Sequence, residues 1–382
     1  MRYLTAGESH GPKLVGILEG VPSGAKIDKE TIDQALQERQ KGPGRGGRMK
    51  IEKDQVTILS GVRGGLTTGA PIALEIINRD WANWEKIMAW GDEADLESRK
   101  VITPRPGHAD LTGHLKYRTE VRNVLERASA RETAMRVAIG NIAVQILEAL
   151  GVEIRGQVLS VGKVHMNSED TPEYWQRVQA SEWKVGDPQG EEALYTQLQE
   201  ARSKGESLGG VLQIQVQNLL PGLGSYVQWD RKLDGRLAQA VLSVQAIKGV
   251  AFGMGFAAGQ HFGSEVHDPI GYDSGRGYYR YSNNAGGIEG GMTNGEPVII
   301  EAVMKPIPTL YSPLSTVNLE TKEVMEASVE RSDVCAVPAA LVVLKHVAAW
   351  EILQAILEKF PADTWDELDK AWQDYKRFVS EQ

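Results

Sequence analysis

The chain has 382 residues, of which 41% are hydrophobic and 24% charged, an ordinary composition for a globular protein. Its 51 acidic and 42 basic residues give a net charge of -9, which argues against general nucleic-acid binding. The single cysteine, Cys335, excludes an internal disulfide framework. No apolar run predicts a membrane span and the first residues lack the apolar stretch of a signal peptide, so we expect a cytoplasmic protein.

Strands and helices are predicted in clusters rather than in strict alternation. The predicted strands cover residues 14–21, 56–61, 71–77, 152–161, 211–218, 250–257 and 297–304. The predicted helices cover residues 29–40, 130–150, 231–244, 339–359 and 365–380. This order favours an α+β fold with largely antiparallel sheets over a doubly wound parallel sheet.

Two predicted helices carry more apolar surface than one buried face requires. The helix at 130–150 has a wide apolar stripe that includes Met135 and Ile139, and Gly151 is typical of a helix end. The helix at 339–359 is apolar nearly all round in its first half. Both need cover on two sides, so we expect a central helical layer between sheets.

Three polar segments combine histidine, serine, glycine and arginine. They are Gly7-Glu8-Ser9-His10-Gly11, Arg105-Pro106-Gly107-His108-Ala109-Asp110 and Arg127-Ala128-Ser129-Ala130-Arg131-Glu132. Histidine ordinarily titrates near neutrality, which makes His10 and His108 candidates for proton transfer. Glycine allows a ligand to approach the backbone closely. The segments predict an anion-binding enzyme with two catalytic histidines.

Positive charge is gathered in two stretches, although the chain as a whole is acidic. The first contains Arg39, Lys41, Arg45, Arg48 and Lys50, and the second contains Lys116, Arg118, Arg122, Arg127, Arg131 and Arg136. Solvated surface is the simpler interpretation for most of the lysines. The arginines in glycine-rich surroundings favour a small polyanion, because a guanidinium binds phosphate or carboxylate bidentately.

The segment from Ser129 to Glu132 has the pattern of a capping box, in which the serine caps a helix and the glutamate returns the bond three residues later. Most capping boxes are only helix starts. Here Arg127 and Arg131 flank the box, and a helix N-terminus offers free N–H groups and the positive end of a dipole. We therefore predict a phosphate or carboxylate site at this helix start.

Other segments have less specific interpretations. Arg331 and Asp333 are either an ordinary ion pair or an acid/base aspartate beside a ligand-binding arginine. The glycine run at 285–295 is either a turn or a backbone cradle for a ligand, and 253–259 is read as a glycine-bearing strand. Cys335 is read as a packing residue. We expect no metal site, because the spacing of the polar cluster His261, Glu265, His267 and Asp268 matches no standard metal-binding motif.

In their order along the chain, these segments resemble the chorismate synthase family. The matching motifs are 7–11 with Gly20 and Pro22, 105–110, 127–140, 245–249, 284–291 and 331–333, and the resemblance extends from residue 2 to about residue 357. It implies one domain over residues 1–382, an α+β fold with a central helical layer sandwiched between largely antiparallel sheets, and a homotetramer.

The resemblance also implies the reaction. The enzyme would be a carbon–oxygen lyase that converts 5-enolpyruvylshikimate 3-phosphate to chorismate and phosphate by an anti 1,4-elimination. This is the last step of the shikimate pathway, which leads to aromatic amino acids. The reaction requires reduced FMN without net redox change. NADPH enters only as an indirect or possible source of electrons, and we expect a separate flavin reductase.

Residue roles follow from the matching motifs. His10 would protonate the departing phosphate, His108 would protonate the reduced flavin near N1, and Asp333, aided by Ser9, would relay the C6 proton through flavin N5. The implied substrate-binding residues are Arg39, Arg48, Arg131 and Arg331. The implied cofactor-binding residues are Arg39, Arg45, Arg127, Ala128, Ser129, Gln245, Ala246, Gly290, Lys305, Pro306, Ile307, Pro308, Thr309 and Arg331.

Some positions depart from the common motifs, and two other functions are compatible with parts of the sequence. Ala128 stands where serine is usual, and Ser332 and Val334 stand where histidine and proline are usual. A flavin- or nicotinamide-dependent oxidoreductase is disfavoured, because 253–259 has one residue too many for a dinucleotide fingerprint. An RNA- or polyanion-binding module is disfavoured by the acidic composition and the few aromatics among the basic residues.

Overall fold

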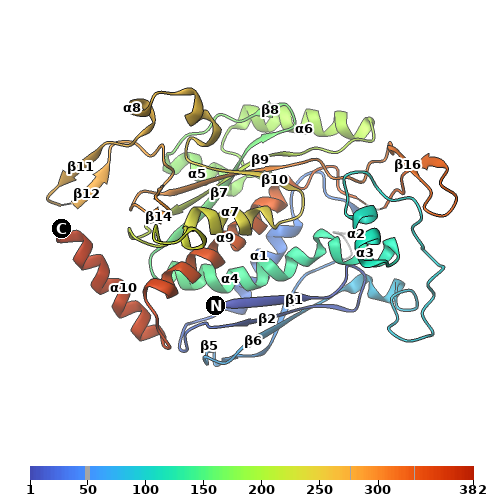
Figure 1. Ribbon diagram of the computed structural model, residues 1–382, viewed down its shortest axis with the longest axis horizontal. Coiled ribbons are helices and arrows are strands. Elements are labelled where there is room, and N and C mark those ends of the chain that lie inside the picture. The colour runs from blue at the N-terminus through green and yellow to red at the C-terminus, as the bar shows by residue number, and fades with distance from the viewer. Residues whose placement is uncertain (48–51, 276, 331) are drawn as a thin grey trace.

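The computed structural model describes residues 1–47, 52–275, 277–330 and 332–382, and its two main sheets enclose a layer of helices (Figure 1). Arg48 and Arg331 lie outside the described residues. The first sheet is antiparallel, in the order β1-β2-β6-β3. Its strands are β1 (Arg2–Ala6), β2 (Lys13–Glu19), β3 (Val56–Ser60) and β6 (Ile72–Ile77). Of these four strands, only β1 is absent from the strands predicted from the sequence.

The second sheet is also antiparallel, in the order β10-β15-β9-β7-β8. Its strands are β7 (Glu153–Val161), β8 (Val164–His165), β9 (Gly210–Gln217), β10 (Ile247–Phe252) and β15 (Val298–Met304). The prediction of a strand to residue 257 is wrong. Gly253 turns the chain at φ 54°, and the 3₁₀ helix η5 (Gly255–Gln260) follows.

The central layer is built from α1 (Lys29–Gln40), α4 (Thr133–Ala149), α7 (Leu233–Leu242) and α9 (Val337–Lys359). Helix α4 contacts β2 and β6 on one side and β7 on the other, and α9 contacts β7 and β9 as well as α1, α4 and α7. The predicted α+β fold with a helical layer between antiparallel sheets is therefore confirmed (Figure 1).

Helices α4 and α9 cross at a small residue and a buried histidine. A Cβ on Gly140 would lie 2.3 Å from the carbonyl oxygen of His346, so only glycine permits this approach. His346 Nδ1 lies 2.6 Å from the carbonyl oxygen of Val342, and Nε2 lies 3.3 Å from Nδ2 of Asn141. Burial lowers the pKa of His346 to about 4, and the nearby Lys345 adds to this effect. The histidine is therefore neutral in the folded protein at pH 7.

The predicted capping box before α4 is wrong in its second half. The Ser129 hydroxyl accepts the backbone N–H of Arg131 at 3.2 Å, within the 3₁₀ turn η3 (Ala130–Glu132). The Glu132 carboxylate does not return to Ser129. It accepts hydrogen bonds from Arg136, one turn later, at 3.0 Å and from Thr5 on β1 at 2.9 Å. These two partners draw the glutamate away from the cap.

Helix α9 is long and apolar enough to cross a membrane by length and composition, which the sequence analysis did not expect. Of its most apolar 18-residue window, 78% is buried inside the protein, against α1, α4, α7 and the second sheet. Its apolar surface is therefore explained by its place in the core. Cys335, just before α9, is also buried, which supports its interpretation as a packing residue, and burial raises the pKa of its thiol to about 12.

The remaining elements lie around these layers. The helices are α2 (Asp110–Tyr117), α3 (Val121–Ala128), α5 (Pro172–Ala180), α6 (Pro188–Ser203), α8 (Gly263–Val266) and α10 (Trp365–Ser380), with 3₁₀ turns η2 (Arg79–Asn83) and η4 (Trp229–Arg231). The hairpins are β4 (Val62–Arg63) with β5 (Leu66–Thr67), β11 (Ile270–Asp273) with β12 (Gly277–Arg280), β13 (Ile288–Glu289) with β14 (Met292–Thr293), and β16 (Ser315–Val317) with β17 (Val324–Glu326). The glycine run at 285–295 is thus a hairpin with its turn.

Candidate active site

The loop between β1 and β2 carries Ser9 and His10 and is anchored from two sides. Asn78, just after β6, donates from Nδ2 to the carbonyl of Gly11 at 2.7 Å. Glu126 on α3 accepts the backbone N–H of Ser9 with its carbonyl oxygen at 2.9 Å. The carboxylate of the same glutamate accepts the backbone N–H of His10 at 2.7 Å. The first sheet and α3 therefore fix this loop together.

The His10 ring is held at one edge and on one face. Its Nδ1 lies 2.8 Å from Oε1 of Glu126, whose side chain is fully buried. Trp84 stacks on the imidazole, with ring centroids 3.8 Å apart and planes inclined by 21°. The His10 side chain keeps 13% of its surface exposed. It can therefore meet a ligand while most of the ring is enclosed.

His108 is held by a second carboxylate. Its Nδ1 lies 2.5 Å from Oδ1 of Asp110, which opens α2. Arg105 donates to Asp110 from Nε at 2.9 Å and to the Thr309 hydroxyl from Nη1 at 2.9 Å. Burial by itself would raise the pKa of the Asp110 carboxyl, but the hydrogen bonds from His108 and Arg105 outweigh burial and hold that pKa well below its usual range.

The two predicted histidines thus share one arrangement, with a carboxylate at Nδ1 and an arginine behind the carboxylate. Such a carboxylate sets the ring orientation and leaves Nε2 for chemistry. Neither carboxylate has a role in the prediction made from the sequence motifs. Asp110 follows His108 by two residues, which is a usable signal, whereas Glu126 lies 116 residues from His10 and has none.

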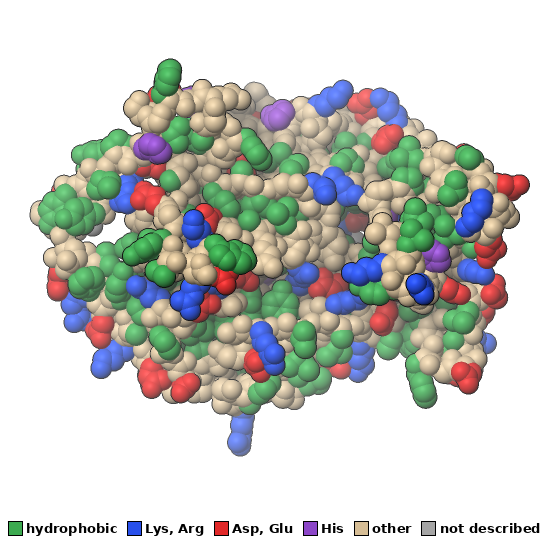
Figure 2. Space-filling model, in the orientation of Figure 1, with side chains coloured by type: hydrophobic (Ala, Val, Ile, Leu, Met, Phe, Trp, Pro, Cys, Tyr) green, Lys and Arg blue, Asp and Glu red, His purple; other side chains and the backbone are tan. Residues whose placement is uncertain are grey.

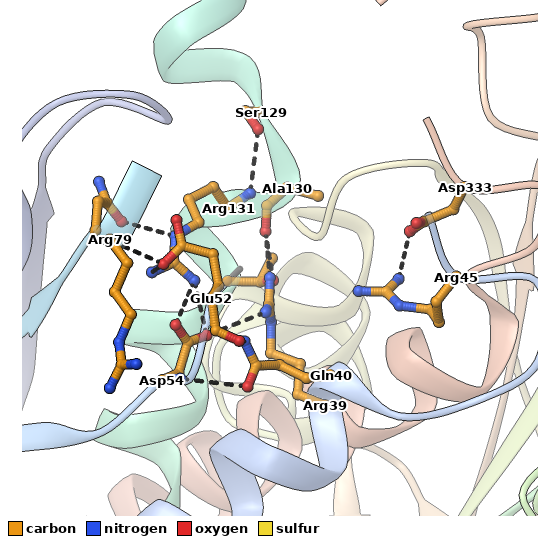
Figure 3. A network of polar contacts seen from close by, with 12 residues as sticks. Arg39, Gln40, Arg45, Glu52, Asp54, Arg79, Ser129, Ala130, Arg131 and Asp333 are labelled. Carbon is orange, nitrogen blue, oxygen red and sulfur yellow. Dashed lines mark hydrogen bonds and ion pairs between the residues drawn. The ribbon is translucent and has the colours of Figure 1, made fainter. Parts of the chain in front are cut away.

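Arg39 and Arg131 meet in a buried network of charges (Figure 3). Arg131 donates from Nη1 to both carboxylate oxygens of Asp54 at 2.7 Å and from Nε to Asn78 at 2.8 Å. Arg39 donates to the carbonyl of Ala130 at 2.9 Å and lies 3.7 Å from Asp54. Helix α1, the segment before β3 and the start of α4 therefore converge on one group of charges.

Two guanidinium nitrogens of this network are buried and donate no hydrogen bond to any described residue. They are Nη1 of Arg39 and Nη2 of Arg131, and the nearest carboxylate oxygens lie 3.7 and 3.8 Å away. Burial lowers the pKa of Arg39 to about 10, Asp54 opposes this effect, and the neighbouring Arg131 and Arg45 add to it. Arg39 is therefore still a cation at neutral pH. Both donors suit an anionic ligand.

Asp333 and Arg45 form an ion pair beside this network (Figure 3). Arg45 Nη1 donates to Oδ2 of Asp333 at 2.5 Å, and the backbone N–H of Gly46 donates to Oδ1 at 2.6 Å. Val334 donates its N–H to the carbonyl of Gly44 at 2.8 Å, a bond that proline could not make. A cavity of about 300 Å³ opens next to the pair, lined by Gly44, Arg45, Gly46, Arg202, Gly205, Glu206, Tyr311, Ser332 and Val334.

Several predicted cofactor-binding residues lie together around the end of β1. Arg127 donates to the carbonyl of Thr5 at 2.9 Å, and Glu132 joins Thr5 to Gln245, whose Nε2 donates to Glu132 at 3.4 Å. The carbonyl of Ala246 accepts the backbone N–H of Lys305 at 2.9 Å. This chain of contacts brings together segments from α3, β1 and η3 with the end of the antiparallel β10–β15 pair at which β10 begins and β15 ends.

The segment from Lys305 to Thr309 continues this group toward His108. Lys305 Nζ donates to the carbonyl of Gly107, and Thr309 accepts from Arg105. Ala128 ends α3, directly before the capping residue Ser129. Gly290 does not join them. It lies in the turn between β13 and β14, and Figure 1 shows β14 left of centre, whereas α2 and α3 lie on the right.

The residues present fit a phosphorylated flavin and an anionic substrate. Besides the two guanidinium donors, Oε1 of Gln245 is a buried acceptor without a hydrogen bond from the described residues, as an N–H group of a flavin ring would require. Lys305 and Arg127 supply positive charge nearby. Figure 2 shows a hollow right of centre on this face, with Lys and Arg side chains beside it.

Comparison with known proteins agrees with this geometry. The family model for chorismate synthase matches residues 1–357. Chorismate synthases of Desulfitobacterium hafniense and Aquifex aeolicus are 97% and 50% identical to the chain, covering 100% and 99% of it and 100% and 98% of their own lengths. A crystal structure of chorismate synthase superposes with a TM-score of 0.81 at 41% identity, over 100% of this chain and 98% of that one. The chain therefore belongs to the chorismate synthase family.

Proposed function

We propose that this chain converts 5-enolpyruvylshikimate 3-phosphate to chorismate and phosphate and needs reduced FMN to do so. The observation that carries the proposal is the pair of histidine–carboxylate contacts, His10 with Glu126 and His108 with Asp110, in a site that also holds buried arginines. The 97% identity to a full-length chorismate synthase supports the same reaction.

The substrate would be held by its phosphate and its two carboxylates. Nη1 of Arg39 and Nη2 of Arg131 are the buried donors available to it among the described residues. Arg48 and Arg331 complete the substrate-binding set in our proposal, although both lie outside the described residues. Bidentate guanidinium contacts would fix the orientation of the ring as well as its position.

His10 acts as the general acid in this proposal. Its Nδ1 is engaged by Glu126, so a ring that carries protons on both nitrogens delivers the Nε2 proton to the departing phosphate oxygen and keeps the Nδ1 proton. His108 holds a second proton beside the flavin position, with its Nδ1 engaged by Asp110. Asp333, aided by Ser9, takes up the proton from C6. Because Asp333 is paired with Arg45, that arginine must first turn to another anion, and the substrate supplies one.

The cofactor would be held by the residues that surround the end of β1. Arg127, Ala128, Ser129, Gln245 and Ala246 form one side in the proposal, and the segment from Lys305 to Thr309 forms another. Reduced FMN held there would supply electron density to the reacting substrate without net redox change. The buried acceptor of Gln245 and the amine of Lys305 supply complementary groups for it.

We propose further that the chain is one domain over residues 1–382 and works as a homotetramer in the cytoplasm. The large core cluster, which includes side chains from both main sheets and from the helices between them, supports the one-domain organisation. We assign flavin reduction to a separate reductase, with NADPH as the indirect source of electrons. Gly290, in the turn between β13 and β14, completes the proposed FMN-binding residues.

The test is an anaerobic mixture of the purified protein, chemically reduced FMN and 5-enolpyruvylshikimate 3-phosphate, with chorismate and phosphate followed together. We expect equal amounts of both products, and none with oxidised FMN. His10→Ala and His108→Ala should each lower turnover by about 10²–10⁴ while FMN still binds. Product formed equally well with oxidised FMN would contradict the proposal, and so would the absence of product despite bound reduced FMN.

A further inference from the structure

Two side chains outside the predicted site enclose the ring of His10. Glu126 contacts it at Nδ1 with one carboxylate oxygen, at 2.8 Å, and accepts the backbone N–H of the same residue with the other, at 2.7 Å. One carboxylate therefore fixes both the backbone and the ring of His10. Trp84 covers the ring face at a centroid distance of 3.8 Å.

Glu126 is itself held in place by its surroundings. Its side chain is fully buried, and Arg122, one helical turn earlier, lies 3.6 Å from Oε1. Arg122 is fixed in turn, since it donates to the carbonyl of Arg99 at 2.7 Å and to Glu330 at 3.0 Å. A buried carboxylate needs such partners. Because a carboxylate can only accept hydrogen bonds, Nδ1 of His10 must carry the proton between them.

Trp84 is also fixed, and its contribution is geometric. The indole N–H donates to Asp80 at 3.3 Å, and the residue is only 4% exposed. The guanidinium of Arg99 lies 4.3 Å from the ring centroid and that of Arg122 lies 5.3 Å from it. Since two cations already interact with this ring, its main effect on His10 is to set the plane of the imidazole rather than to stabilise its charge.

We infer that Glu126 and Trp84 are positioning residues for His10. Glu126 keeps the proton on Nδ1, and Trp84 fixes the ring plane, so that Nε2, which no described residue bonds, points in one direction toward the ligand. The inference rests on the proposed function only in naming the departing phosphate as the group that receives the proton. The orientation of the ring can be measured independently of turnover.

The first test reads the tautomer of His10 directly. Protein with ¹⁵N-labelled histidine is examined by NMR at neutral pH, and the His10 signals are identified by their loss in His10→Gln. We expect the neutral ring to carry its proton on Nδ1 in the wild type and a mixture of tautomers in Glu126→Gln, because a glutamine can donate or accept. A wild-type ring protonated on Nε2, or no change in Glu126→Gln, would overturn the inference.

Two matched variants control this measurement. Asp110→Asn should change the His108 signals and leave those of His10 alone, because Asp110 contacts only the other ring. Glu75→Gln removes a carboxylate from the outer face of the first sheet, where it pairs with Lys13 at 2.9 Å, and should change neither histidine. If the His10 signals changed in both control variants, the change in Glu126→Gln would reflect a general effect on the fold, and the inference would be contradicted.

The second test separates positioning from a merely structural role. Glu126→Gln and Trp84→Leu should lower kcat by about tenfold or more and leave KM within about threefold, whereas Trp84→Phe keeps a stacked ring and most of the rate. In a His10→Ala background, Glu126→Gln should cause no further loss, since it acts only through His10. A loss that persists undiminished in that background would overturn the inference.

The outcomes also distinguish the two proposals. If His10→Ala alone retains wild-type turnover, the proposed role of His10 in the reaction fails. The tautomer measurement then still decides whether Glu126 and Trp84 set the state of the ring.

Discussion

At the scale of single residues, the site is made of charged side chains that are buried in pairs. Each of the two histidines has a carboxylate at Nδ1, and each of the arginines Arg39 and Arg131 lies against Asp54. Such a pair contributes little net free energy to folding, because the cost of removing the two charges from water offsets their mutual attraction. Breaking one pair by removing a single partner is nevertheless severe, since the other charge stays buried.

Asp54→Asn tests this reasoning. The change leaves Arg39 and Arg131 buried with one counter-charge fewer, and we expect the free energy of unfolding to fall by about 3–5 kcal/mol. Urea denaturation followed by circular dichroism measures the loss. Glu75→Gln, which breaks the more exposed pair with Lys13, should lower stability by no more than about 1 kcal/mol. Equal losses in the two variants would contradict the argument.

At the scale of elements, the close crossing of α4 and α9 is the tightest constraint on the central layer. Gly140 allows the approach, and His346 and Asn141 place polar groups at the crossing. The sequence predicted both helices and their burial from the apolar pattern alone. It could not predict which residues meet, because 205 residues separate Asn141 from His346.

Two glycine substitutions in helices should act in opposite directions. In Gly140→Ala the new Cβ would meet backbone atoms of α9 at 2.3 Å, so the helices must separate and stability should fall by about 1–3 kcal/mol. In Gly235→Ala on α7 the new Cβ meets nothing within 4 Å, so the better helix former should raise stability by about 0.5–1 kcal/mol. Thermal denaturation of both variants shows whether each change raises or lowers the stability of the protein. Two changes of the same sign would refute this account.

The pH dependence of stability should report His346. Its pKa is about 4 in the folded protein, below the value of about 6.5 for an exposed histidine, so the unfolded chain binds the proton first on acidification. The contribution of His346 is therefore fully present above pH 6.5 and is lost as the pH falls toward 4. The loss is on the order of 3 kcal/mol. Urea titrations at several pH values should show this component in the wild type and not in His346→Gln. An identical pH dependence in the two proteins would contradict it.

At the scale of the whole molecule, the pattern of apolar residues predicted the fold class and the order of layers. Besides α5, α6 and several short strands, it missed β1, α2 and α3, which are only five to eight residues long and which bring His10, Glu126 and Asp110 into place. The motifs named both histidines and the arginines. They could not name Glu126, Trp84, Asp54 or Asn78, because these residues act through contacts between distant segments.

The helical layer should make the two sheets unfold together. Helix α4 contacts strands of both main sheets, α9 packs on α4 and on the second sheet, and most buried apolar side chains belong to one large cluster that reaches both sheets. We therefore expect one cooperative transition, with far-ultraviolet circular dichroism and tryptophan fluorescence changing at the same urea concentration. Two separated transitions would show that the layers fold as independent units.

The charges around Asp54 also bear on how this protein could adapt to heat. Guanidinium and carboxylate groups occupy the interior beside α1 and α4. Well-packed hydrophobic side chains of similar volume would often make a protein equally stable or more stable at such a place. Variants selected for thermal tolerance alone would tend to lose this network and the anion site with it. Selection that also requires growth would preserve the network and find its gains elsewhere, at positions such as Gly235. The tolerated stabilising mutations would then lie outside the active site, and the positions without such mutations would mark it.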